Sequence, residues 1–226
     1  WFNLHTGSKN IVQEGPFKYT RQVKKAAKAE KWLFTKEDFN TFPNLILSTD
    51  FKTTKVISNA NPQQADYKWG SMELVQWTSL DGTVLNGLLA KPDNFDPTKK
   101  YPMIVNFYER SSDALYEHKL PVAGRSQINY TFYTSRGYLV FNPDIPYKIG
   151  YPGESALQAV VSGTTALIDK GFVDKNNIGI QGHSWGGYQI AYILTRTNLF
   201  KCAESGAPVV NMFSAYGGIR WESGMS

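Results

Sequence analysis

Hydrophobic positions follow one pattern up to about residue 58 and a different one from residue 72 onward. In the first part they form short, partly alternating runs separated by polar turns, at 31–37, 43–50 and 52–58. Alternating apolar and polar positions place side chains on opposite faces of a strand, so these runs predict an antiparallel meander. Residues 1–4 and the turn after them predict the end of another hairpin. Residues 21–30 are rich in helix formers, but we interpret them as a polar approach to the next strand.

From residue 72 the pattern predicts strands that alternate with helices. The polar, proline-containing stretch 58–70 separates the two parts. Two apolar runs within 72–92 flank Asp81-Gly82, which is a strong hairpin signal. Further runs predict strands at 102–108, 138–142 and 178–181, and helices at 155–171 and 188–197. Alternation of this kind implies a mainly parallel sheet.

Composition narrows the classes of protein that fit. The chain has 226 residues, 42% of them hydrophobic, which is enough for one core plus part of another domain. The net charge of +5 is small for this length, and the lysines near residues 21–31 have no interleaved aromatics, so we expect a solvated face and no nucleic acid. The single cysteine, Cys202, permits no internal disulfide, and its small and apolar neighbours predict that it is buried. No apolar run approaches the roughly 18 residues of a membrane span. No spacing of ligands predicts a metal site.

The strongest chemical signal is a serine in a glycine-rich turn. Gly182-His183-Ser184-Trp185-Gly186 matches G-x-S-x-G, and Gly187 follows. The turn lies between a predicted strand and a predicted helix, which is the setting of a nucleophile elbow. The glycines let strand and helix pass closely, and the amide after the serine, the Trp185 N–H, points at a developing oxyanion.

No residue of the chain is placed to activate that serine. His183 is adjacent to Ser184, but neighbouring side chains on such a turn diverge. His118 lies in a polar loop and His5 in the first part of the chain. A serine without a base is a weak nucleophile at neutral pH.

Several segments in order resemble one family of enzymes. They are the hairpin around Asp81-Gly82, Lys99-Lys100-Tyr101-Pro102, residues 135–144 (SRGYLVFNPD), residues 150–154 (GYPGE), the serine turn, and residues 205–209 (SGAPV). Together they resemble the catalytic domain of prolyl oligopeptidase-family serine peptidases, on the dipeptidyl peptidase and acylaminoacyl peptidase side. The resemblance implies an α/β-hydrolase fold, incomplete and with a mainly parallel sheet, at 70–226. It implies that 1–69 are antiparallel strands from the C-terminal part of a β-propeller.

The resemblance also implies roles for individual residues. Ser184 is the nucleophile, the Trp185 N–H is one oxyanion donor, and the Tyr108 hydroxyl is the second. The glycines of the elbow and the residues expected to bind substrate are Gly182, Gly186, Gly187, Val209, Met212 and Tyr216. After Tyr108 the family has glycine-rich sequence, whereas this chain has Glu109-Arg110-Ser111-Ser112. That loop is expected to carry its own salt bridge or to bind substrate differently.

The activity implied is that of a serine peptidase that cleaves short peptides through an acyl-enzyme, as a dipeptidyl or oligopeptidyl peptidase. The family places its Asp and His beyond residue 226, so the segment alone is expected to be inactive. Two alternatives stay open: an esterase on the same fold, and a non-catalytic hydrolase-like binding module. The implied partner is a peptide, with no nucleic acid, no membrane span, no metal and no cofactor. The resemblance leaves room for a homo-oligomer formed through the part beyond residue 226, and it alone favours export over a cytoplasmic location.

Overall fold

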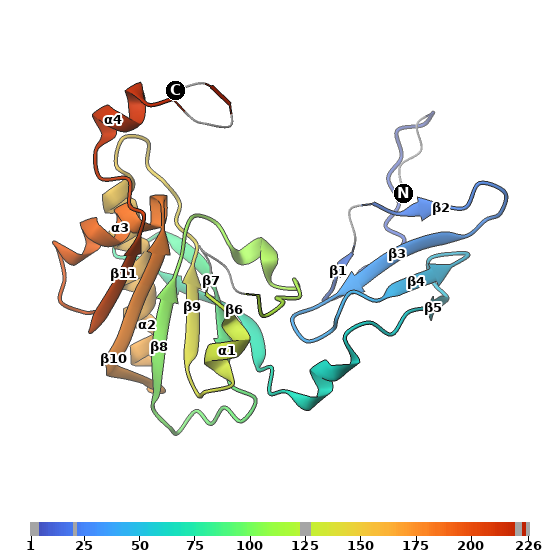
Figure 1. Cartoon of the computed structure of the whole chain (residues 1–226), viewed down its shortest axis with the longest axis horizontal. Helices are drawn as coiled ribbons and strands as arrows, with labels where there is room; N and C mark the ends of the chain where they lie inside the picture. Colours follow the sequence, from blue (N-terminus) through green and yellow to red (C-terminus); the bar gives the residue numbers. More distant parts are fainter. Residues whose placement is uncertain (1–4, 20–21, 123–127, 220–222, 225–226) are drawn as a thin grey trace.

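Two β-sheets form the framework of the computed structural model, which describes residues 5–19, 22–122, 128–219 and 223–224 (Figure 1). The predicted hairpin strand at residues 1–4 and the cationic residue Arg21 lie outside the described residues. The first sheet is antiparallel, and the second is mixed and mainly parallel. The α/β class expected from the sequence is therefore confirmed.

The first sheet contains the predicted meander. Its strands are β1 (Lys18–Tyr19), β2 (Lys24–Lys25), β3 (Trp32–Glu37), β4 (Leu45–Ser48) and β5 (Thr54–Val56). β3, β4 and β5 pair antiparallel in sequence order, and β1 and β2 both pair with β3. The cross-strand partners Phe34 and Ile46 are buried, as alternation requires. The described residues of 21–30 hold β2 and a turn but no helix, which agrees with the interpretation from the sequence.

The second sheet has the strand order β11-β10-β8-β9-β7-β6. The hairpin around Asp81-Gly82 joins β6 (Ser71–Thr78) to β7 (Val84–Lys91), with Gly82 at a positive φ of 85°. The four strands β8 (Tyr101–Asn106), β9 (Leu139–Pro143), β10 (Val173–His183) and β11 (Cys202–Gly206) run parallel. The sequence pattern predicted all of these strands except β11.

Helices cover both faces of the second sheet (Figure 1). α2 (Pro152–Asp169) and α3 (Trp185–Leu194) pack against each other on one face, while the short α1 (Tyr130–Thr134) packs on β7 and β9. Neighbouring residues in the strands separate the two sides: Phe141 joins the large core under α2 and α3, and Val140 joins a smaller cluster with Tyr130. The sequence predicted α2 and α3 but not α1, the 3-10 turns η1 (Pro62–Asp66) and η2 (Ser112–Ala114), or α4 (Met212–Gly217).

The chain changes its direction of travel across the sheet at β8 and β9. From β8 it crosses to β9 by way of α1, and from β9 it returns past β8 to β10 by way of α2 on the other face. Such a reversal leaves a crevice at the carboxyl ends of the parallel strands, where α/β proteins bind their ligands. The topology therefore places the candidate site at that edge.

The loop after β8 reaches the first sheet. Its residue His118 is buried, stacked on Trp69 at 5.1 Å between ring centroids and edge-on to Phe42 at 5.4 Å, and its Nε2 pairs with Gln64 Oε1 at 2.9 Å. Burial lowers the pKa of this imidazole, and the charge of Asp38 partly opposes the shift. Beside it, Lys18 of β1 bonds to Glu117 at 2.6 Å. The loop is polar in sequence, but His118 acts as a packing residue at the junction.

One expectation about burial is wrong. Cys202 is exposed, although its neighbours in sequence are small or apolar. It opens β11, which is the last strand in the order, and no described strand pairs with its outer edge. Small apolar neighbours indicate a core position only when another element covers the strand, and the local sequence does not carry that information.

Candidate active site

The residues with candidate chemistry follow the carboxyl ends of adjacent parallel strands. Tyr108 comes two residues after β8, Asp144 one residue after β9, and Ser184 one residue after β10. Because parallel strands end at the same edge, residues distant in the chain meet there. This edge is also the topological reversal described above.

Ser184 has the strained backbone expected of a nucleophile elbow. Its φ is 57° and its ψ is −111°, and α3 begins at the next residue, Trp185. A non-glycine residue at positive φ costs free energy and persists only where the surroundings hold it. Here the Ser184 N–H donates to the Gly206 carbonyl at 2.7 Å. The Trp185 amide belongs to the first turn of α3, where N–H groups have no intrahelical acceptor.

The three glycines of the turn are required by close backbone packing. A Cβ on Gly186 would lie 2.8 Å from the Phe107 carbonyl oxygen, and one on Gly187 would lie 2.8 Å from the Gly206 carbonyl oxygen. A Cβ on Gly182 would lie 3.0 Å from the Gly186 carbonyl carbon. Real Cβ atoms do not approach backbone so closely, so the turn packs directly on β8 and β11.

A cavity of about 950 Å³ brings Ser184 and Tyr108 together. Its chemistry is polar and cationic, because Arg110 and Lys119 line it and, among the described residues, no carboxylate does. Both cations are engaged: Arg110 pairs with Asp113 at 2.8 Å, and Lys119 pairs with Glu117. The remaining lining residues are Leu88, Asn106, Phe107, Ser111, Ala114, Tyr130, Asn142 and His183.

The side chain of Tyr108 is half exposed, whereas its backbone carbonyl is fixed by hydrogen bonds. Its carbonyl oxygen accepts a hydrogen bond from the Tyr147 hydroxyl at 2.8 Å and another from Gln189 Nε2 at 3.3 Å. Gln189 Nε2 also bonds to the Tyr147 hydroxyl oxygen. The backbone of Tyr108 is thus tied to the loop after β9 and to α3, the helix that Ser184 precedes.

The loop after Tyr108 is organised by a single carboxylate. Asp144 Oδ1 accepts hydrogen bonds from the Ser111 N–H at 2.6 Å and the Ser112 N–H at 2.9 Å. The loop carries the Arg110–Asp113 salt bridge, which is one of the two alternatives expected from the sequence. Both of its partners are largely exposed, so it contributes little to stability.

Among the described residues, neither His118 nor His183 is hydrogen-bonded to Ser184. His183 lines the same cavity as Ser184, whereas His118 is buried at the junction with the first sheet. The described residues therefore hold a serine and candidate oxyanion donors without a histidine positioned as base.

The residues expected to bind substrate lie apart from this cavity. Val209, Met212 and Tyr216 are not among the residues that line it. Val209 is half-buried, and the side chain of Tyr216 on α4 is 89% exposed. Figure 1 shows α4 beyond the ends of β10 and β11. The structure brings together Tyr108, Ser184 and the elbow, but not the three expected pocket residues.

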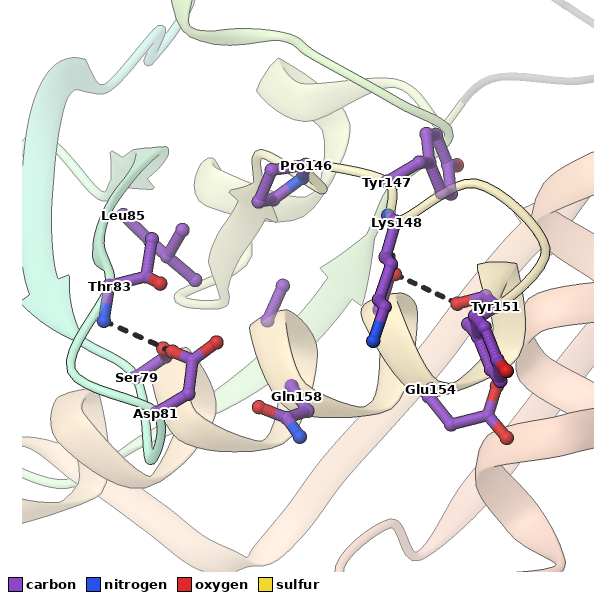
Figure 2. A pocket seen from close by; sticks show the side chains of 12 residues that line it. Ser79, Asp81, Thr83, Leu85, Pro146, Tyr147, Lys148, Tyr151, Glu154 and Gln158 are labelled. Carbon is purple, nitrogen blue, oxygen red and sulfur yellow. Dashed lines mark hydrogen bonds between the residues drawn. The ribbon is translucent and has the colours of Figure 1, made fainter.

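A second cavity, of about 480 Å³, lies between the β6–β7 turn and the start of α2 (Figure 2). Ser79, Asp81 and Thr83 line one end, and Tyr147 and Lys148 lie toward the other. Figure 2 shows Glu154 and Gln158 of α2 along its floor. Tyr147 lines this cavity, and its hydroxyl also bonds to the carbonyl of Tyr108, which lines the first cavity.

Two kinds of feature are absent from the part of the chain that the structure describes. No group of three or more His, Cys, Asp or Glu side chains there could hold a metal ion. Among the same residues, no helix combines the length and apolarity that a bilayer crossing requires.

Sequence reasoning missed Asp144, Tyr147 and Gln189. The motif ending in Asp144 was noticed only as part of a resemblance, and Tyr147 lies in a loop with no recognisable pattern. Gln189 follows the glycine turn at helical spacing, so a polar residue on the buried face of an apolar helix was a signal that could have been used. What each contacts depends on the strand order.

Comparisons with known proteins agree with this geometry. Residues 149–223 match the model of the prolyl oligopeptidase family. Human dipeptidyl peptidase 8 is 28% identical over 153 residues, covering 61% of this chain and 16% of that protein. The uncharacterized peptidase YuxL of Bacillus subtilis is 23% identical over 150 residues, covering 64% of this chain and 23% of that protein. The chain thus spans less than a quarter of the length of these relatives.

Solved structures are similar over almost the whole chain. Pyrococcus horikoshii acylaminoacyl peptidase aligns with a TM-score of 0.67 and 19% identity, covering 94% of this chain and 34% of that one. Porphyromonas gingivalis dipeptidyl peptidase 4 aligns with a TM-score of 0.65 and 20% identity, covering 91% of this chain and 31% of that one. At this level of identity the likeness establishes the fold.

Proposed function

Since residues 149–223 belong to the prolyl oligopeptidase family, we propose that this protein is a serine peptidase that cleaves short peptides through an acyl-enzyme. The observation that carries the proposal is the strained Ser184 turn, which shares one cavity with Tyr108. Relatives named as dipeptidyl peptidases support a dipeptidyl or oligopeptidyl substrate.

In the proposed reaction Ser184 Oγ bonds to the carbonyl carbon of the scissile peptide bond and gives its proton to a general base. The resulting oxyanion accepts hydrogen bonds from the Trp185 N–H and the Tyr108 hydroxyl, which is protonated at neutral pH. The C–N bond then breaks, and the leaving amine takes the proton from the base. Water hydrolyses the acyl-enzyme by the reverse sequence and frees Ser184.

The base is the part of this mechanism that residues 1–226 do not supply. His118 is buried against Trp69, and neither it nor His183 bonds to Ser184. We therefore propose that residues 1–226 alone do not hydrolyse peptides. The family's Asp and His, in the full-length protein, complete the site.

The same proposal extends to the two parts of the chain. Residues 1–69 are the C-terminal part of a β-propeller, and residues 70–226 are the N-terminal part of an α/β-hydrolase domain. The change from an antiparallel to a mainly parallel sheet between β5 and β6 supports this division.

The test is a Ser184→Ala variant of the full-length protein, compared with Ser135→Ala, whose hydroxyl donates to the Phe132 carbonyl and accepts from Arg136. Hydrolysis of dipeptidyl amides and labelling by a fluorophosphonate should be lost in Ser184→Ala and kept in Ser135→Ala. Residues 1–226 alone should not be labelled at the rate of the full-length protein. Faster cleavage of simple esters than of dipeptidyl amides would favour an esterase. No Ser184-dependent hydrolysis of either would favour a binding module.

A further inference from the structure

Tyr147 reaches from the loop after β9 to the base of the Tyr108 loop. Its hydroxyl donates to the Tyr108 carbonyl at 2.8 Å and accepts a hydrogen bond from Gln189 Nε2. Gln189 Nε2 also donates to the Tyr108 carbonyl at 3.3 Å. The Tyr108 carbonyl thus receives two donors that also bond to each other, so the Tyr108 backbone cannot shift without breaking both bonds.

The protonation state of Tyr147 agrees with its contact to Tyr108. Burial raises the pKa of Tyr147 to about 12, so its hydroxyl keeps its proton at neutral pH and continues to donate.

The buried side chain of Gln189 makes these hydrogen bonds although its position lowers the stability of the fold. It lies on α3 with 0% exposure, and its Oε1 has no hydrogen-bond partner in the described part of the chain. A buried carbonyl left without a hydrogen-bond partner destabilises a protein. An apolar side chain would avoid that cost, so the contribution of Gln189 is its NH₂ group, which holds Tyr147 and Tyr108.

We propose that Tyr147 is a positioning residue, which, with Gln189, holds the backbone of Tyr108 at the geometry in which the Tyr108 hydroxyl stabilises the oxyanion. This inference rests on the proposed peptidase function and adds to it. Misplacement of a donor by about 1 Å is enough to cost a large factor in rate, because oxyanion stabilisation depends on preorganised donors.

The position of Tyr147 makes a clean substitution available. Its ring is half-buried and lines one end of the second cavity (Figure 2), so it is not enclosed on all sides. Tyr147→Phe keeps the ring and removes only the hydroxyl. Tyr192→Phe is the matched control, because the Tyr192 hydroxyl bonds to Glu154 at 2.7 Å, and no hydrogen bond joins it to Tyr108 among the described residues.

The experiment measures dipeptidyl amide hydrolysis by the full-length protein and its Tyr147→Phe, Tyr108→Phe and double variants. We expect kcat of Tyr147→Phe to fall about tenfold with KM nearly unchanged, because the donor acts in the transition state. When Tyr108 is already Phe, adding Tyr147→Phe should lower kcat by less than about threefold. The Ki of a peptide boronic acid, which forms a tetrahedral adduct, should rise by the same factor as kcat/KM falls. Tyr192→Phe should leave all of these values unchanged.

The outcomes separate this inference from the proposed function. Hydrolysis that is lost in Ser184→Ala but unchanged in Tyr147→Phe overturns the positioning role and leaves the peptidase proposal standing. A tenfold loss that is fully additive with Tyr108→Phe also overturns it, since Tyr147 would then act independently of Tyr108. Absence of Ser184-dependent hydrolysis in the unmodified protein overturns both.

Discussion

The Ser184 turn and the Tyr108 loop meet at one edge of the sheet but are held there by different forces. Steric exclusion between backbone atoms holds the Ser184 turn, because the glycines bring it within van der Waals contact of β8 and β11. Hydrogen bonds to side chains of other elements hold the Tyr108 loop: Tyr147 and Gln189 donate to it, and Asp144 accepts from it. One half of the candidate site is rigid by packing, and the other is rigid only while its polar contacts are made.

This difference implies different responses to substitution. A turn held by backbone contact tolerates no added atom, so even one methyl group is disruptive. A loop held by several hydrogen bonds loses them one at a time, and each loss is partial.

Among the variants that test this difference, Gly186→Ala should have the largest effect on stability and activity. The new Cβ would lie 2.8 Å from the Phe107 carbonyl, and backbone cannot yield as a flexible side chain can. We expect a loss of about 1–3 kcal/mol in the free energy of unfolding and a fall of about 100-fold or more in kcat/KM. Chemical denaturation and dipeptidyl amide kinetics of the full-length protein check both. Gly217→Ala, where nothing lies within 4 Å of the added Cβ, is the control for stability. Equal stability of the two variants would contradict the steric account.

Asp144→Asn should have an intermediate effect on activity, because it loosens the Tyr108 loop and leaves the Ser184 turn unchanged. The carboxylate accepts from the Ser111 and Ser112 amides, and a neutral acceptor weakens both bonds without removing them. We expect kcat/KM to fall about tenfold and the reactivity of the loop toward limited proteolysis to rise. Asp96→Asn is the matched control for Asp144→Asn. Asp96 also accepts a hydrogen bond from a backbone amide, that of Thr98 at 2.9 Å, but it lies away from the site. The loop account is wrong if the two variants are cleaved at the same rate.

The smallest expected effect concerns His118 at the junction with the first sheet. Its pKa is lowered from 6.5 by burial, so the unfolded chain binds a proton more readily than the folded one. Stability from this group is complete above about pH 6.5 and decreases as pH falls below that value. Between pH 7.5 and 5.5 we expect His118→Asn to lose about 2 °C less in Tm than the unmodified protein.

Thermal unfolding of both proteins at the two pH values is the measurement for His118. His5→Asn removes an exposed histidine and serves as the control. If His5→Asn reduces the acid sensitivity as much as His118→Asn does, the sensitivity does not come from the junction.

Many of the strands and helices could be predicted from the sequence, for reasons that differ from one element to the next. The Asp81-Gly82 hairpin, the meander and the strands β8, β9 and β10 follow from turn chemistry and short apolar runs, which act locally. β11 was missed because its residues, Cys202 to Gly206, form neither an apolar run nor an alternating pattern, and pairing with β10 makes them a strand. α1 and α4 were missed because helices of 5 and 6 residues are too short to show a helical period.

By itself the sequence determined the fold class and the serine turn, since periodicity and the backbone freedom of glycine depend only on neighbouring residues. The partners of Tyr108 were decided by the tertiary structure. The two side chains that hold its carbonyl lie 39 and 81 positions further along the chain. They meet Tyr108 because β8, β9 and β10 are adjacent and parallel, so that the residues after them share one edge. The burial of His118 and the exposure of Cys202 have the same origin, because burial depends on which element of the fold covers a residue.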